Sequence, residues 1–187
     1  GFGWGAPPPP VLPTFRRLNF VPGTLETARF GPEGRSIYFS QRIAGGRPEL
    51  FVVRSGRTEP EALGIRDALL MDVSSTGELA FLSAPRHWVG GRYRGLLARV
   101  PGGGGAVRPV EEDVTEVVWD GEGLARILSH EDGITLEFPQ GRRLLTSSHQ
   151  TRTLCQMRLS REGTHLALVD SDARTRAEIV TYDREGR

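Results

Sequence analysis

Short runs of alternating hydrophobic and polar residues, separated by glycine-containing turns, dominate this chain. One local pattern occurs four times: a strand-like run, a large apolar residue and a glycine four positions after it. The glycines are Gly34, Gly77, Gly123 and Gly163, and each is followed by a second alternating run. Because glycine supplies the positive φ that tight hairpin turns require, this pattern predicts four β-hairpins.

Further apolar runs follow each predicted hairpin. The third runs are 50–53, 96–100, 134–138 and 179–182, and weaker fourth runs are 61–65, 107–110 and 142–145. The four glycines are 43, 46 and 40 residues apart, a period typical of propeller blades. No segment keeps a 3.6-residue period over the length of a helix. We therefore predict an all-β fold, a partial β-propeller of about four antiparallel blades with three to four strands each.

The period also predicts the organisation of the chain. The predicted blades cover 24–67, 68–112, 113–150 and 151–187, the last one incomplete. Residues 15–20 resemble a solitary outer strand, so the predicted propeller region is 15–187. Residues 1–14 contain Pro7–Pro10 and Pro13, whose fixed φ and missing N–H groups predict an extended linker. An immunoglobulin-type sandwich is also all-β, but its strands do not recur as four-strand units.

The large apolar residue before each turn is a candidate for the core. These residues are Phe30, Val73, Trp119 and Leu159. Since they occupy the same place in each repeat, we expect all four to pack one blade against another. Burial of such a side chain stabilises a protein by about 1.5 to 3 kcal/mol.

Composition narrows the classes of function. The chain has 187 residues, 37% of them hydrophobic, with 24 basic and 23 acidic residues and a net charge of +1. This balance argues against a whole-domain nucleic-acid or membrane-surface binder. All the basic residues are Arg, which excludes Schiff-base, phosphate-loop and kinase chemistry that needs a Lys. Cys155 is the single cysteine, so the chain contains no internal disulfide and no zinc site built on several thiolates.

The residues that could carry chemistry do not form recognisable motifs. His87, His130, His149 and His165 lack metal-ligand spacing. Asp170-Ser171-Asp172 lacks the Gly and Glu of a calcium loop, and Gly102–Gly105 lacks the Lys of a phosphate loop. No Gly-x-Ser-x-Gly nucleophile motif occurs. We therefore expect no catalytic activity, no cofactor and no metal.

A basic and aromatic cluster is the best candidate for binding a partner. It consists of Arg86, His87, Trp88, Arg92, Tyr93 and Arg94, to which Arg99 is close in sequence. Gly90-Gly91 places the cluster in a long connection between two strands of the second blade, where loops on a rigid scaffold commonly bind. Arg and aromatic side chains can stack on and pair with an anionic or peptide partner. The alternative is a solvated loop in which Trp88 covers a blade edge. An acidic turn, Glu111-Glu112-Asp113 with Glu116, could instead receive an Arg-rich peptide.

Several segments resemble a known family. They are Phe15–Phe20, Ala28–Arg35, Glu49–Phe51, Val73–Ala80 and Leu136–Gly141. In this order they resemble the TolB-like, WD-repeat-like propeller that follows the kinase domain and membrane helix in bacterial transmembrane serine/threonine protein kinases. The resemblance spans 15–187; its turn motif is shared with TolB and with the propellers of prolyl-oligopeptidase-like peptidases.

The resemblance implies a non-catalytic sensor or protein-interaction region. Its partner would be a protein or peptide and not a nucleic acid. Any membrane attachment would come from a segment upstream of residue 1, and the region would lie on the extracytoplasmic side. The alternatives are the gating propeller of a serine peptidase and a periplasmic TolB-like scaffold. No residue of the kinase active site is present to carry kinase activity over to this chain.

Overall fold

The computed structural model describes residues 21–187 except 58, 89–91, 122, 149–151 and 173–175. Fourteen β-strands and no helix occur in this part of the chain, which confirms the prediction of an all-β fold. Adjacent strands pair antiparallel in every sheet. The predicted linker 1–14 and solitary strand 15–20 lie outside the described residues.

The first blade is a four-stranded sheet in simple meander order. Its strands are β1 (Thr24–Phe30), β2 (Ser36–Arg42), β3 (Glu49–Arg54) and β4 (Glu61–Arg66). The predicted third run, 50–53, and fourth run, 61–65, lie within β3 and β4. A meander follows from short turns between consecutive strands, because only antiparallel pairs can be joined by tight turns.

The next seven strands form one continuous sheet that contains two blades. They are β5 (Ala68–Val73), β6 (Glu78–His87), β7 (Tyr93–Pro101), β8 (Arg108–Trp119), β9 (Leu124–Ser129), β10 (Ile134–Glu137) and β11 (Arg143–Ser147). β8 belongs to both blades, because its first half pairs with β7 and its second half with β9. Asp113, at φ 59, bends the strand between these halves. Asp67, at φ 52, stands at the equivalent place between β4 and β5. Aspartate tolerates this left-handed conformation better than most residues.

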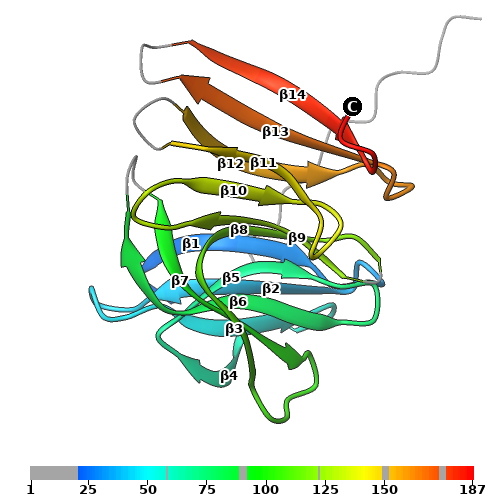
Figure 1. The fold of residues 1–187 in the computed structure, drawn as a ribbon. Helices are drawn as coiled ribbons and strands as arrows, with labels where there is room; N and C mark the ends of the chain where they lie inside the picture. Colours follow the sequence, from blue (N-terminus) through cyan, green and yellow to red (C-terminus); the bar gives the residue numbers. More distant parts are fainter. Residues whose placement is uncertain (1–20, 58, 89–91, 122, 149–151, 173–175) are drawn as a thin grey trace, which may run out of the picture.

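The last sheet has three strands, β12 (Arg152–Leu159), β13 (His165–Asp172) and β14 (Ala177–Asp183). The first strands of the four blades, β1, β5, β8 and β12, contact one another in that order. The blades therefore follow one another around these inner strands, from blue to red in Figure 1. This is the architecture of a partial propeller.

The hydrophobic core lies between successive blades. One cluster joins the first and second blades, including Leu50 and Phe81, and a second joins the second and third, including Leu82 and Trp119. A third cluster, which includes Phe138, joins the third and fourth. Strands buried on both faces need apolar residues at successive positions, which explains runs such as Ala68–Met71.

The core prediction is correct for Trp119 and wrong for Phe30. Trp119 is 9% exposed and packs on the preceding blade, and Val73 and Leu159 are partly buried against the preceding blade in the same way. Phe30 is 69% exposed. The shared position faces the preceding blade, and no described blade precedes β1. Residues at the same position of the repeat are therefore not buried to the same extent.

The third predicted turn also differs from the other three. Gly34, Gly77 and Gly163 adopt positive φ, at 64°, 84° and 70°, as predicted. Among the described residues of the third turn, Gly121 has a positive φ, at 93°, and Gly123 does not. The Asp120 N–H donates to the Gly123 carbonyl, which closes a shorter turn between β8 and β9.

Candidate functional site

The predicted binding loop is the β6–β7 hairpin, and only Trp88 and Arg92 of its six residues lie between the two strands. Arg86 and His87 belong to β6, and Tyr93 and Arg94 belong to β7, so the prediction of one long connection is wrong for these four. Most of the six side chains contact other blades. The Arg94 guanidinium stacks on the Trp88 ring at 3.7 Å and donates to the Ser129 carbonyl at 3.0 Å. Trp88 Nε1 donates to Ser129 Oγ at 2.9 Å. Arg94 also lies 3.4 Å from the carboxylate of Asp113. The loop thus holds the second blade against β9 of the third.

Two other members of the cluster contact the further strands β12 and β2. Arg92 donates to the Leu154 carbonyl in β12, and Tyr93 accepts a hydrogen bond of 3.1 Å from Arg42 in β2. His87 packs on the Tyr93 ring with a centroid distance of 4.7 Å. Arg86 and His87 are exposed. The structure therefore brings the six predicted residues together, with Trp88, Arg92, Tyr93 and Arg94 in contacts that also stabilise the fold.

A pocket of about 520 Å³ lies where the four inner strands meet, and we call it the axial pocket. Arg92 and Tyr93 of the predicted loop are part of its wall. The inner strands contribute the rest of the lining: Glu26, Thr27, Arg29, Leu69, Leu70, Met71, Thr115, Glu116, Thr153, Cys155 and Gln156. Charged groups of both signs thus converge on one cavity from several blades.

Each inner strand has a β-bulge beside this pocket. The pairing register shifts between Leu25 and Thr27 in β1, Leu70 and Asp72 in β5, Val114 and Glu116 in β8, and Cys155 and Arg158 in β12. A bulge bends the strand and redirects the side chain that follows it. In each inner strand the register shift is followed by a polar or charged residue: Thr27, Asp72, Glu116 or Arg158.

Three of these side chains connect one inner strand to the next. Thr27 Oγ1 donates to the Leu70 carbonyl at 2.8 Å, and the Asp72 carboxylate accepts the Trp119 N–H at 2.8 Å. Glu116 accepts the backbone N–H of Gln156. Sequence reasoning missed this series. A usable signal was the charged residue five positions before the turn glycine in three repeats, Arg29, Asp72 and Arg158.

Burial determines the electrostatics of the axis. It raises the pKa of Asp72 and of Glu116 above their ordinary values, against the opposing effect of hydrogen bonds and of nearby arginines. It lowers the pKa of Arg29, and the charge of Arg158 lowers it further. Burial also raises the pKa of the Cys155 thiol. Desolvation, which disfavours the charged form, is the largest contribution to each of these shifts.

The raised carboxylate pKa values predict a pH dependence of stability. The folded state binds protons more tightly than the unfolded state at Asp72 and Glu116, so this contribution is largest below about pH 4 and is lost as the pH rises through the raised values. We expect the double variant Asp72→Asn, Glu116→Gln to lose less free energy of unfolding than the parent as the pH rises from about 4 to 7. Urea unfolding across this range measures it, with Glu162→Gln on an exposed turn as the control. A double variant with the same pH dependence as the parent would contradict the raised pKa values of Asp72 and Glu116.

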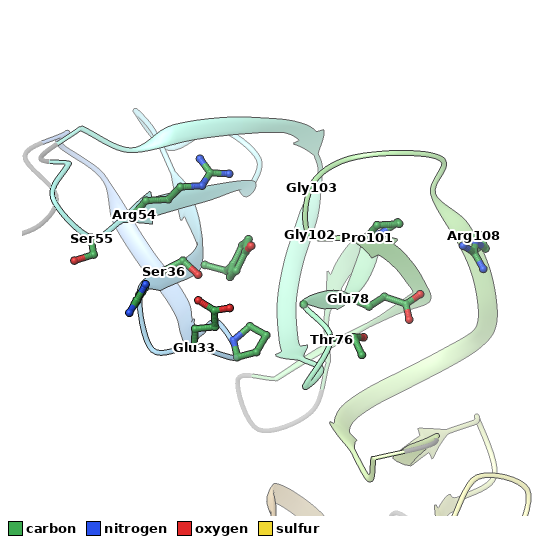
Figure 2. A pocket seen from close by; sticks show the side chains of 14 residues that line it. Glu33, Ser36, Arg54, Ser55, Thr76, Glu78, Pro101, Gly102, Gly103 and Arg108 are labelled. Carbon is green, nitrogen blue, oxygen red and sulfur yellow. The ribbon is translucent and has the colours of Figure 1, made fainter.

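A second and larger pocket, of about 670 Å³, lies between the turns of the first two blades (Figure 2). We call it the interblade groove. Glu33, Ser36 and Arg54 line it from the first blade, and Figure 2 shows Gly102 and Gly103 on the facing turn. A side chain at Gly102 would place its Cβ 2.2 Å from the Gly77 carbonyl oxygen. Glycine at 102 therefore permits the close approach of the two turns that form one wall.

The remaining candidate residues are dispersed in the structure. Among the described residues no three His, Cys, Asp or Glu side chains are grouped so that they could hold a metal ion. His130 lies 3.4 Å from Asp113, whereas His165 contacts Thr164. His149 is outside the described residues. In the candidate calcium loop, Asp170 is paired with Arg152 through two carboxylate oxygens. Glycines 102–105 form the turn between β7 and β8.

The predicted acidic turn is not a turn, because its residues lie within strand β8, and the fold directs its carboxylates to different places. Glu111 lies 3.5 Å from Arg126, Asp113 contacts Arg94, and Glu116 faces the axis. These carboxylates therefore do not form one acidic surface. In the described part of the chain, no helix is long and apolar enough to cross a membrane.

Comparison with known proteins identifies the fold. No family model matches the chain, and no curated protein matches it in sequence. Among solved structures, TolB from Acinetobacter baumannii is similar with a TM-score of 0.63 and 15% identity over 87% of this chain. A protein described as a TolB from Agrobacterium tumefaciens is similar with a TM-score of 0.64 and 13% identity over 84% of this chain. The chain spans 42% and 60% of the lengths of these two proteins.

The structures of two enzymes are similar to this chain to a comparable degree. A prolyl endopeptidase has a TM-score of 0.60 and 12% identity over 88% of this chain, which corresponds to 25% of the enzyme. A puromycin hydrolase has a TM-score of 0.58 and 18% identity over 88% of this chain and 28% of the enzyme. At these identities the similarity is one of fold. The chain has the fold of a partial β-propeller, which it shares with parts of these proteins.

Proposed function

We propose that this chain is a non-catalytic binding propeller that contacts a protein or peptide at the axial pocket. The observation that carries the proposal is the convergence of charged and polar side chains on one cavity of about 520 Å³. They come from β1, β8 and β12 and from Arg92 and Tyr93, whereas β5 contributes apolar residues. A pocket on rigid strands with a few convergent polar groups is a typical binding site. Arg92 and Tyr93 connect this pocket to the exposed residues Arg86 and His87 of the predicted loop.

The charges of the axial pocket suit a peptide better than a polyanion. Glu26 and Glu116 stand with Arg29 and Arg92 in one lining, so the pocket carries charges of both signs. Glu26 is paired with Arg42, and Arg92 donates to the Leu154 carbonyl. Gln156 is exposed at the same pocket and has a φ of 56°. Backbone strain at a non-glycine residue often accompanies a functional position. This strain supports the proposed role of the pocket wall.

A peptide-array screen with the full chain, followed by variants, tests the proposal. We expect Gln156→Gly to weaken binding of a selected peptide about threefold to tenfold, because it removes an exposed contact while glycine accepts the positive φ. Gln140→Gly, at an exposed glutamine outside the pocket, is the matched control. A bound peptide should also slow thiol labelling of Cys155. A peptide that leaves labelling and the Gln156 variant unaffected would place binding elsewhere, and hydrolysis or phosphotransfer by the purified chain would contradict a non-catalytic role.

The resemblance noted in the sequence suggests the protein context of this propeller. We propose that it is the sensor region of a bacterial transmembrane serine/threonine kinase, on the extracytoplasmic side of the membrane. The second candidate is a gating propeller, supported by the similarity to the prolyl endopeptidase and the puromycin hydrolase. The third is a TolB-like scaffold, supported by the two TolB structures.

The coding sequence on either side distinguishes these contexts. An upstream kinase domain with a membrane helix supports the sensor role. A downstream domain with a Gly-x-Ser-x-Gly motif supports the gating role and contradicts the other two. A secretory signal upstream without a kinase supports the scaffold role.

A further inference from the structure

The interblade groove is a second cavity that the axial pocket does not include. It lies between the β1–β2 and β3–β4 turns of the first blade and the β5–β6 and β7–β8 turns of the second. Its volume of about 670 Å³ is within the range of ligand sites. The two pockets have no lining residue in common. The groove can therefore be tested independently.

Positive charge exceeds negative charge among the groove residues that are free to bind a ligand. Three arginines and two glutamates line it. Arg54 is paired with Glu61, and Glu78 is paired with Arg99 at 2.6 Å. Arg35 and Arg108 are exposed and form no ion pair within the described residues, and the same is true of Glu33. Two arginines and one glutamate are thus left without a charged partner.

Neutral groups in the groove are able to hydrogen-bond to the oxygen atoms of a peptide. The hydroxyls of Ser36, Ser55 and Thr76 line it, and Figure 2 shows these side chains on both of its sides. The N–H of Gly103 has no partner in the described chain and belongs to a turn without side-chain bulk. Hydroxyl and backbone N–H groups bind carboxylate and carbonyl oxygens, as do arginines.

The apolar part of the lining is small and rigid. Pro32 lines it from the first blade and Pro101 from the second, and the buried side chain of Tyr38 belongs to the same lining. A Cβ at Gly102 would be 3.0 Å from the Tyr38 hydroxyl, so the ring is held closely by the second blade. Proline and tyrosine side chains have few rotatable bonds. Contact between a peptide backbone and these three residues therefore costs little side-chain entropy.

From these features we propose that the interblade groove binds an acidic peptide segment, with its carboxylates paired to Arg35 and Arg108. This deepens the proposed function, since it assigns a partner chemistry to a binding propeller, but it uses a different surface. The segment spans the boundary between two blades, where the arginines are contributed by the turn after β1 and by the start of β8. Glu33 stands beside Arg35 and opposes the binding of a carboxylate.

The test is titration of the full chain with labelled penta-glutamate, with penta-glutamine and inorganic phosphate as comparison probes. We expect saturable binding of penta-glutamate that weakens with salt, and a loss of about threefold to tenfold in affinity for Arg35→Gln and for Arg108→Gln. Glu33→Gln should strengthen binding, since it removes a like charge. Arg161→Gln is the matched control, because Arg161 is an exposed arginine on the corresponding turn of the fourth blade and changes the net charge equally.

The outcomes separate this proposal from the axial one. Absence of saturable binding, or an equal loss for Arg161→Gln, would overturn the acidic-peptide proposal. Displacement of the peptide by inorganic phosphate at a similar concentration would also overturn it, in favour of a general anion site. A peptide that binds the axial pocket while penta-glutamate fails to bind removes only the groove proposal. Penta-glutamate binding that leaves Cys155 labelling unchanged supports a groove separate from the axis. Circular dichroism and thermal unfolding confirm that each variant is folded.

Discussion

Replacement of Trp119 by alanine is expected to cost about 3 to 5 kcal/mol of the free energy of unfolding. The side chain is 9% exposed and packs against the second blade in a cluster that includes Leu69 and Leu82. The Arg99 guanidinium lies over its ring at 4.5 Å. Alanine would leave a cavity between two blades and remove this contact. Because a domain is usually stable by about 5 to 15 kcal/mol, the loss is a large share of the total.

Phe30→Ala is the matched control for this experiment. Phe30 is an aromatic residue at the same position of the repeat, but it is 69% exposed. We expect its replacement to change the free energy of unfolding by less than about 0.5 kcal/mol. Urea unfolding followed by circular dichroism measures both variants. Equal losses of the free energy of unfolding in the two variants would contradict the burial of Trp119 and the exposure of Phe30.

Replacement of Glu137 by alanine should have the second largest effect, about 3 kcal/mol. Arg126 is buried within the third blade, and its Nη2 lies 2.8 Å from the Glu137 carboxylate. The side chains of this pair are only 9% and 13% exposed. Removal of the acid leaves a buried guanidinium with a single, longer ion pair to Glu111 at 3.5 Å. An uncompensated buried charge is strongly destabilising.

Two controls distinguish the loss of charge pairing from a general effect of substitution. Glu111→Ala should cost less than about 1 kcal/mol, because its side chain is 41% exposed and the attraction is screened. Replacing both Arg126 and Glu137 with methionine should restore most of the stability that Glu137→Ala loses, because no unpaired charge remains. A double variant as unstable as Glu137→Ala would show that the effect does not come from the charge of Arg126.

The local part of the fold was predictable because strands and hairpins have short-range signals. The predicted run 50–53 lies in β3, and 179–182 lies in β14. These elements depend on alternation with period 2 and on a turn residue with suitable φ, both of which are visible within about ten residues. The failure at Gly123 has the same origin. Gly121 and Gly123 both suit the turn chemically, and the chain uses Gly121 for positive φ.

The candidate sites were less predictable because they combine residues from different blades. Arg92 contacts the carbonyl of Leu154, 62 positions later, and the Asp72 carboxylate accepts the N–H of Trp119, 47 positions later. The basic and aromatic loop was visible as a cluster in the sequence. Which of its residues contact another blade depends on Ser129 and Arg42, their partners in those blades. Nothing in the sequence around Ser129 or Arg42 indicates these contacts.

By itself the sequence determined the all-β class, the antiparallel hairpins and the repeat with a period near that of a propeller blade. Alternation and turn chemistry act between neighbouring residues, so they need no knowledge of the tertiary structure. Only the tertiary structure decided that Phe30 is exposed while Trp119 is buried, and that charged residues of three blades line one axial pocket. The physical reason is that burial and desolvation depend on which blade covers each face, and that neighbour is separated in sequence by an entire repeat.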